Sequence, residues 1–68
     1  MTHDQTAIMV LAMRAYGGGF VTALARALEA ADSQNRARLL AAFPDMVSAY
    51  GPGSAFYRAC DDQGAGHD

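Results

Sequence analysis

The segment Ala7–Met13 restricts the fold of this chain more than any other feature, because all seven of its residues are apolar. A helix over this segment is apolar on every face, whereas a helix at the surface of a globular protein keeps one polar face. The helix is therefore either buried on all sides or packed against another molecule. The whole chain has only 68 residues, and in a chain of that size the hydrophobic gain and the loss of conformational entropy nearly cancel.

The sequence provides neither a disulfide nor a zinc site that would stabilise this small chain. Cys60 is the single cysteine, so an intramolecular disulfide is excluded. The two histidines, His3 and His67, lie near opposite ends without the paired spacing of a zinc site. We therefore expect no metal and no cofactor. Association with a second chain is the remaining way to stabilise so small a fold. We therefore expect a homodimer or a stable complex with a partner.

The composition indicates helices throughout. Fifteen of the residues are alanine, β-branched residues are few, and no segment alternates as a strand does. We predict an all-α fold, a small bundle of three helices plus a short C-terminal helix, completed by oligomerisation. Residues 1–60 form one domain. Residues 61–68 are polar and contain glycine, and we predict that they form a disordered tail.

Capping residues and glycines predict the first two helices. Thr2 and Gln5 have the spacing of a capping box, so the first helix begins there. The glycine run after Tyr16 ends this helix, with glycine in the left-handed conformation, unless one kinked helix continues across it. The second helix runs from Phe20 to Ala31. Its apolar face has a spacing of four and comprises Phe20, Leu24 and Leu28.

The third helix begins at Ser33, because Asp32 can accept a hydrogen bond from Gln34 or Asn35 as an N-cap. Its apolar stripe comprises Leu39, Leu40, Phe43, Val47 and Tyr50. Pro44 interrupts the stripe, so the helix either kinks or ends and restarts with this proline in its first turn. Gly51–Gly53 stops the helix, and Ser54 can cap a last helix through Ala59.

The sequence offers no arrangement of residues that supports catalysis. Cys60 lacks a positioned base, since both histidines stand near the chain ends. Asp61 and Asp62 are neighbours in the predicted tail and cannot hold the fixed separation that acid–base chemistry requires. Gly17–Gly19 is followed by no Lys-Ser/Thr pair and preceded by no strand, so it predicts a tight turn or a close helix crossing. We expect a protein that is not an enzyme.

Charge and the N-terminal sequence bear on partners and location. The net charge of −2 provides no basic surface for duplex DNA, so nucleic acid is disfavoured as a partner. No basic segment precedes the first apolar run, which favours the cytoplasm over secretion. Arg14 and the three glycines interrupt the apolar stretch Ala7–Ala25, and we expect no membrane span.

Aromatic residues and arginines form the candidate partner-binding set, because tyrosines with nearby arginines are typical of protein interfaces. Phe20 and Phe43 fit the helical stripes and are assigned to the core. Arg36 has a structural alternative, an ion pair with Asp32 four residues earlier. The predicted partner-binding residues are Tyr16, Arg36, Arg38, Tyr50, Tyr57 and Arg58.

Part of the chain resembles a loose group of small helical proteins encoded by tailed phages and prophages. The resemblance covers about half of the chain and lies in Tyr16–Val21, Ala23–Ala25, Ala31–Asp32, Asn35, Leu39, Ala42–Pro44 and Tyr50. Members of the group often have Tyr-Gly-Ser-Phe where this chain has additional glycine, and an aromatic residue in place of Leu28. The resemblance implies a phage accessory protein, a class that includes anti-CRISPR proteins and other inhibitors of host proteins.

These features together favour a non-enzymatic helical module that binds a protein partner, such as a phage or prophage inhibitor of a host protein acting in the host cytoplasm. One alternative is a small helix-turn-helix DNA-binding regulator, in which Arg36 and Arg38 read the groove. A virion assembly component is another.

Overall fold

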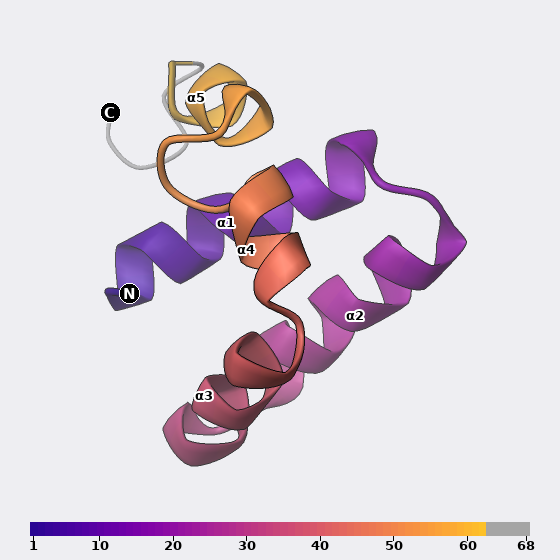
Figure 1. Cartoon of the computed structure of the whole chain (residues 1–68), viewed down its shortest axis with the longest axis vertical. Coiled ribbons are helices and arrows are strands. Elements are labelled where there is room, and N and C mark those ends of the chain that lie inside the picture. The colour runs from indigo at the N-terminus through magenta and orange to yellow at the C-terminus, as the bar shows by residue number, and fades with distance from the viewer. Residues whose placement is uncertain (63–68) are drawn as a thin grey trace.

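The computed structural model describes residues 1–62, and this part of the chain contains five helices and no β-strand. They are α1 (His3–Tyr16), α2 (Gly19–Ala30), α3 (Ser33–Ala42), α4 (Pro44–Tyr50) and α5 (Ala55–Asp62), shown in Figure 1. The predicted all-α class is confirmed. The number of helices exceeds the prediction because the third predicted helix is divided into α3 and α4.

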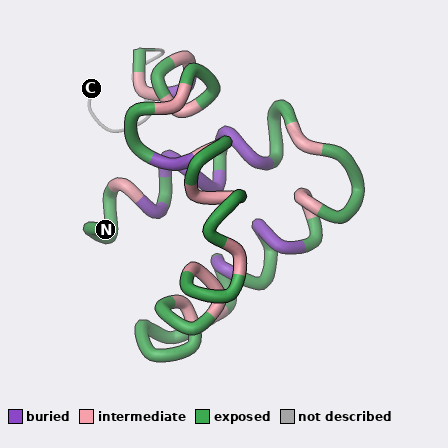
Figure 2. Tube along the Cα trace, in the orientation of Figure 1, coloured by how far each residue is buried: buried purple, intermediate pink, exposed green. Residues whose placement is uncertain are grey.

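Helix α1 is the central element of the fold. It contacts α2, α4 and α5, and Figure 1 shows α4 passing across it. Figure 2 shows that buried positions gather on α1 and on part of α2, whereas the outer surfaces of α3 and α4 are exposed. The buried residues of α1 are Thr6, Ile8, Met9, Val10, Ala12 and Met13. The apolar segment seen in the sequence therefore supplies most of the core.

The core has two clusters that meet on α1. The larger cluster joins α1 to α2 and comprises Met9, Val10, Met13, Leu24, Ala25 and Leu28. The smaller cluster joins α1 to α5 and comprises Ile8, Ala12 and Cys60. Partly buried side chains of α3 and α4 pack against the larger cluster, among them Leu39, Leu40 and Val47, and so does Phe43 between the two helices.

The other side of α1 has no cover from the described helices. Ala7, Leu11 and Ala15 are exposed, and Leu11 keeps 43% of its surface accessible to solvent. The prediction left open whether α1 is buried on all sides or docks against another molecule. Burial on all sides does not occur within the described chain, so the docking alternative remains for this face.

Three of the helices begin at the caps that the sequence predicted. Thr2 Oγ1 accepts from the Gln5 amide at 3.1 Å while Gln5 Oε1 accepts from the Thr2 amide at 2.8 Å, completing the capping box. Asp32 Oδ1 accepts from the Asn35 amide at 2.8 Å. Ser54 Oγ accepts from the Tyr57 amide at 3.2 Å. Each bond satisfies a backbone donor that the first turn of a helix leaves unpaired.

The glycine run separates two helices, which excludes one continuous helix, but Gly17 does not adopt the predicted conformation. Its φ of −88° and ψ of 162° are extended rather than left-handed. Glycine is required here for space, because a Cβ atom at this position would overlap the Val21 side chain and the Met13 carbonyl oxygen. Val21 lies four residues after Gly17, so this contact fits both interpretations of the glycine run, a tight turn and a close helix crossing, while the predicted left-handed conformation is wrong.

Pro44 ends one helix and starts the next, which decides between the two alternatives for this proline. Helix α3 ends at Ala42, and Phe43 leaves the helical region with φ −128° and ψ 65°. Pro44 then occupies the first turn of α4, where its missing amide proton costs no hydrogen bond.

Two further predictions are wrong. Phe20 was assigned to the core but is 61% exposed, touching Phe43 edge-on with ring centroids 5.9 Å apart. Asp61 and Asp62 were assigned to the disordered tail but form the last two residues of α5, so the helical domain extends beyond residue 60. Residues 63–68, the rest of the predicted tail, lie outside the described residues.

Candidate protein-binding surface

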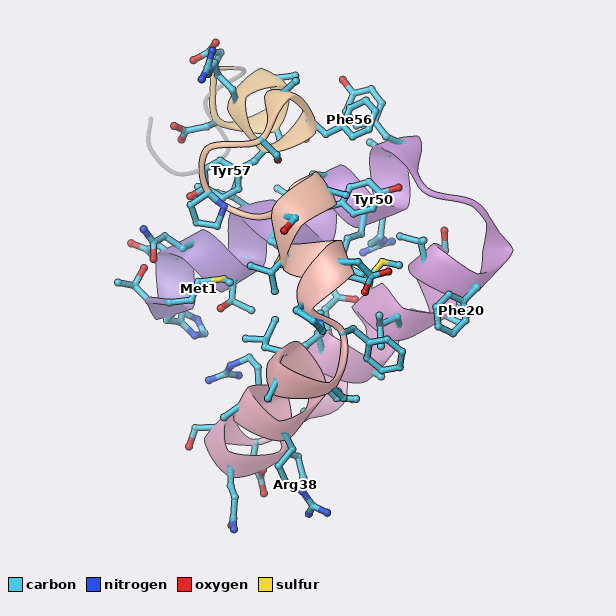
Figure 3. All side chains as sticks on the ribbon, viewed as in Figure 1. Met1, Phe20, Arg38, Tyr50, Phe56 and Tyr57 are labelled. Carbon is cyan, nitrogen blue, oxygen red and sulfur yellow. The ribbon has the colours of Figure 1, made fainter. Side chains whose placement is uncertain are left out.

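Three aromatic side chains from three different helices stack on one another at the surface. Phe56 stacks on both Tyr16 and Tyr50, and Figure 3 shows Phe56 and Tyr50 on the same side of the molecule. The ring centroids of Tyr16 and Phe56 are 4.5 Å apart with an interplanar angle of 15°, and those of Tyr50 and Phe56 are 5.6 Å apart at 20°. We call these three residues the aromatic stack.

Helix ends place the three rings together. Tyr16 is the last residue of α1, Tyr50 is the last residue of α4, and Phe56 is in the first turn of α5. The glycines after Tyr16 and Tyr50 end their helices there, and the Ser54 cap sets where α5 begins. The stack therefore depends on the same local signals that divide the chain into helices.

The aromatic stack keeps a large part of its surface exposed. Tyr16 is 44% exposed and Phe56 is 40% exposed, while Tyr50 is half-buried and packs against both core clusters. Because each ring is held by its neighbour, the stack loses little side-chain freedom when it is covered. Large aromatic side chains that are both exposed and held in place are typical contact residues of protein interfaces.

The structure brings together only two of the six predicted partner-binding residues, Tyr16 and Tyr50. Tyr57 is half-buried and packs against both core clusters, and Arg58 is exposed on α5. Both remaining arginines belong to α3, and Figure 3 shows Arg38 at the opposite end of the molecule from Phe56. The predicted set is therefore divided between separate surfaces.

The two arginines of α3 make local contacts. Arg38 Nη1 donates to Asn35 Oδ1 at 3.3 Å, and Arg36 Nη1 donates to the Ala31 carbonyl oxygen at 3.4 Å. The alternative ion pair between Arg36 and Asp32 is not formed. The ion pair within residues 1–62 joins Arg14 to Glu29, with Nη1 and Oε2 3.4 Å apart. The Asp32 carboxylate caps α3 instead.

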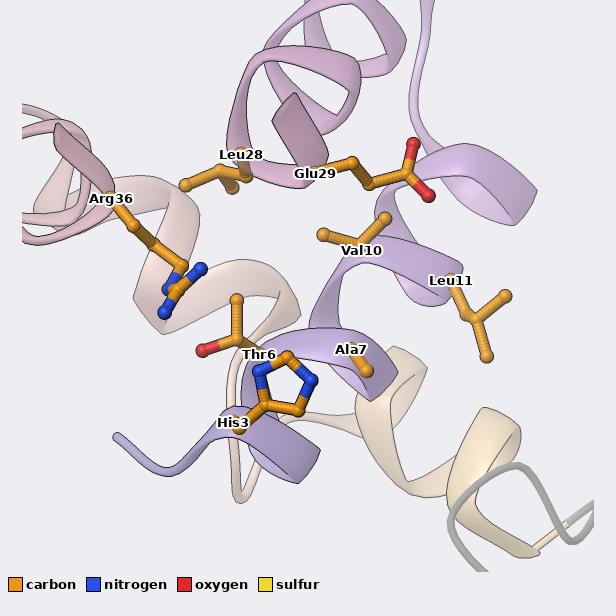
Figure 4. A pocket seen from close by; sticks show the side chains of 8 residues that line it. All are labelled: His3, Thr6, Ala7, Val10, Leu11, Leu28, Glu29 and Arg36. Carbon is orange, nitrogen blue, oxygen red and sulfur yellow. The ribbon is translucent and has the colours of Figure 1, made fainter. Parts of the chain in front are cut away.

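A hollow of about 390 Å³ lies beside α1 and is lined by residues of α1, α2 and α3. Figure 4 shows Arg36 and His3 on one side of it and Glu29 on the other. Its remaining lining residues are mainly apolar, namely Thr6, Ala7, Val10, Leu11 and Leu28. The hollow continues the exposed face of α1 toward α2.

Within residues 1–62, the potential metal ligands stay apart and the thiol is buried. No three His, Cys, Asp or Glu side chains within residues 1–62 gather as metal ligands. Cys60 is 7% exposed and packs among Ile8 and Ala12, an apolar setting that shields its thiol from solvent. Over the same residues, none of the helices has both the length and the apolar composition needed to cross a bilayer.

The surroundings of Tyr57 make its hydroxyl group less acidic. Desolvation raises the pKa of Tyr57 above its ordinary value of 10.0, and the negative charges of Asp61 and Asp4 raise it further. Each effect disfavours the phenolate. The stabilisation from neutral Tyr57 is therefore fully present below the ordinary pKa and is lost as the pH rises through the raised pKa.

We expect Asp61→Asn to lower the pKa of Tyr57 toward its ordinary value, because it removes the larger of the two carboxylate contributions. The change is measured by phenolate absorbance during alkaline titration, with Tyr57→Phe identifying the transition that belongs to this residue. Asp45→Asn on α4 serves as the matched control and should leave the transition in place. An unchanged Tyr57 transition in Asp61→Asn would contradict the electrostatic assignment.

Sequence reasoning missed Phe56, the central ring of the aromatic stack. It assigned the adjacent Tyr57 to the surface, whereas Tyr57 turns inward and Phe56 outward. The spacing of Tyr57 and Cys60, three residues apart on one helical face, is the local signal that could have indicated the inward direction. No local signal places Phe56 beside Tyr16, forty residues earlier in the chain.

Comparison with known proteins gives no relative from which a function could be inferred. No family model, curated protein or solved structure matches this chain.

Proposed function

We propose that this chain is a non-enzymatic protein–protein interaction module that binds its partner through the aromatic stack. The observation that carries the proposal is the pair Tyr16 and Phe56, stacked with centroids 4.5 Å apart while about two fifths of each side chain stays exposed. Covering apolar surface contributes about 25 cal/mol per Å². A partner that covers both rings therefore gains this energy at little cost in side-chain entropy.

The chemistry of the stack indicates what the partner presents. The exposed rings offer apolar faces, and the hydroxyl group of Tyr16 offers a hydrogen bond. A partner surface with an apolar pocket and a polar rim fits both features, which is the usual composition of a protein interface. The module acts by occupying that surface and needs no chemistry of its own.

The resemblance to small phage and prophage proteins supports a host protein as the partner. A phage inhibitor of the anti-CRISPR type acts by covering a functional surface of a host protein in the host cytoplasm. The DNA-binding alternative has less support, because Arg36 is half-buried with its guanidinium bonded to the Ala31 carbonyl oxygen. The net charge of −2 adds to this argument.

Alanine substitution in the stack tests the proposal. We expect Phe56→Ala to weaken partner binding by at least about 2 kcal/mol, the scale of an interface hot spot, which is about thirtyfold in Kd. The partner is first captured from host lysate with the native chain and then purified for titration calorimetry.

Phe20→Ala is the matched control, since Phe20 is the other strongly exposed phenylalanine and lies on α2 away from the stack. It should bind the partner as the native chain does. Equal binding by the native chain and by Phe56→Ala, with both shown to be folded by circular dichroism, would contradict the proposal.

A further inference from the structure

The uncovered face of α1 has a composition that suits a second helix. Between His3 and Ala15, the exposed residues are His3, Asp4, Ala7, Leu11, Arg14 and Ala15. Four of them, Asp4, Ala7, Leu11 and Arg14, are separated by three, four and three positions. This is the spacing of a coiled-coil seam, in which one line of residues faces a neighbouring helix. We call these four residues the α1 seam.

The centre of the α1 seam is apolar and its ends carry opposite charges. Leu11 projects from the middle with 43% of its surface exposed, beside the small side chain of Ala7. Asp4 stands in the first turn of α1 and Arg14 in the last. Helices α2, α4 and α5 contact α1, yet all four seam residues remain exposed.

We propose that the α1 seams of two copies of this chain pair in antiparallel orientation to form a homodimer. In an antiparallel pair, Asp4 of one copy lies level with Arg14 of the other, and Leu11 lies level with Ala7. Each copy thus places a large side chain over a small one and a carboxylate beside a guanidinium. A parallel pair would instead set Asp4 beside Asp4 and Arg14 beside Arg14, which repel.

The charge pattern is what selects a second copy as the occupant of this face. The seam is complementary to itself when reversed, as a twofold interface requires, because the same residues serve both sides. The small side chain of Ala7 also allows the two helix axes to approach closely, since the distance between packed helices depends on the side chains at the contact.

Arg14 can serve both its present contact and the proposed one. Its Nη1 atom lies 3.4 Å from Glu29 Oε2, and the two side chains are 51% and 47% exposed. A guanidinium has five N–H donors. Arg14 can therefore keep Glu29 on its own chain while it donates to Asp4 of the second copy, so that two carboxylates flank one cation.

The dimer goes beyond the proposed function and does not depend on it. Tyr16, at the end of α1, packs against Phe56 of α5, whereas the seam lies on the face that α5 leaves uncovered. Pairing through the α1 seam consequently leaves the aromatic stack of each copy free. A dimer built in this way displays two partner-binding surfaces.

Charge reversal tests the antiparallel pairing. Sedimentation equilibrium of the native chain over a wide concentration range should show a monomer–dimer equilibrium. Asp4→Arg and Arg14→Asp, each measured alone, should weaken the dimer by about tenfold, because each creates two repulsive pairs.

An equimolar mixture of the two variants should recover native affinity. In the mixed dimer, the arginine introduced at position 4 of one variant faces the aspartate introduced at position 14 of the other. At the second contact, the unchanged Arg14 of the first variant faces the unchanged Asp4 of the second. Arg26→Asp is the control, because it makes the same change of charge as Arg14→Asp at an exposed position of α2. It should dimerise like the native chain.

Specific outcomes would overturn the pairing. A native chain that stays monomeric at all concentrations would overturn it, as would a mixture that dimerises no better than its components. Leu11→Ala provides a second variant that does not alter charge, and it should weaken the dimer by at least about tenfold through the loss of two apolar contacts. A native dimer constant in Leu11→Ala would also overturn the proposal. Partner binding by Phe56 is measured separately, so its failure is distinguishable from failure of the dimer.

Discussion

Leu28→Ala is expected to lower the free energy of unfolding by about 2–5 kcal/mol. Leu28 is 2% exposed and belongs to the core cluster that joins α1 to α2. Removing its branched end forfeits apolar burial and leaves a cavity that the helices refill only in part. A chain of this length has a total stability of roughly 3–10 kcal/mol. The substitution should therefore leave a large unfolded population at ordinary temperature, measured by urea unfolding followed by circular dichroism.

Phe20→Ala, in the same helix, is the matched control for Leu28→Ala. It removes a larger apolar side chain, but Phe20 is 61% exposed and its aromatic contact is the edge-on one with Phe43. Such a contact contributes about 0.5–1.5 kcal/mol. A loss of stability in Phe20→Ala as large as that in Leu28→Ala would contradict the arrangement of α2 on the core.

The contrast between Phe20 and Leu28 shows where sequence reasoning reached its limit. A spacing of four residues turns the helix by about 40° more than a full revolution, so Phe20 and Leu28 lie about 80° apart around the axis. Periodicity identifies the apolar side of α2 but not how far its neighbours extend over that side. Phe20 lies at the edge of this cover, beside the glycines that begin the helix.

Helix boundaries were predictable because their signals are local. Three N-cap side chains each accept a hydrogen bond from the backbone amide three residues later, namely those of Thr2, Asp32 and Ser54. Pro44 restricts the conformation of its immediate neighbour. The all-α class followed from composition, which reflects the same local preferences. These features need no knowledge of which helices meet.

The aromatic stack was only half predictable, because it depends on contacts between distant parts of the chain. Tyr16 and Tyr50 were identified as interface residues by type, but Phe56 joins them only through the packing of α5 against α1 and α4. The end of α5 illustrates the same limit. Asp61 and Asp62 are polar and suggested disorder, yet burial of Cys60 on the inner face holds the helix through both residues.

Gly17→Ala is expected to lower the free energy of unfolding by about 1–3 kcal/mol, the usual cost of forcing an extra group into a packed site. Its backbone, with φ −88° and ψ 162°, suits any residue, so no conformational strain arises. The added Cβ would instead overlap the Val21 side chain and the Met13 carbonyl oxygen. To relieve the overlap, the Val21 side chain of α2, which packs against the larger core cluster, must move away from the end of α1. The shift in the midpoint of urea unfolding measures this cost.

Gly18→Ala, one residue later, is expected to change stability much less. No atom lies within 4 Å of the position that its Cβ would occupy, and its φ of −83° and ψ of −162° are accessible to alanine. Replacing glycine at such a site reduces the freedom of the unfolded chain, a gain of about 0.4–1 kcal/mol. The gain is offset because alanine is a poorer N-cap than glycine and Gly18 is the N-cap of α2. A loss of stability at Gly17 without a comparable loss at Gly18 would show that Gly17 is required for the close approach of α2 to the end of α1 rather than for a flexible link. Equal losses at both positions would indicate instead that the link itself needs the conformational freedom of glycine.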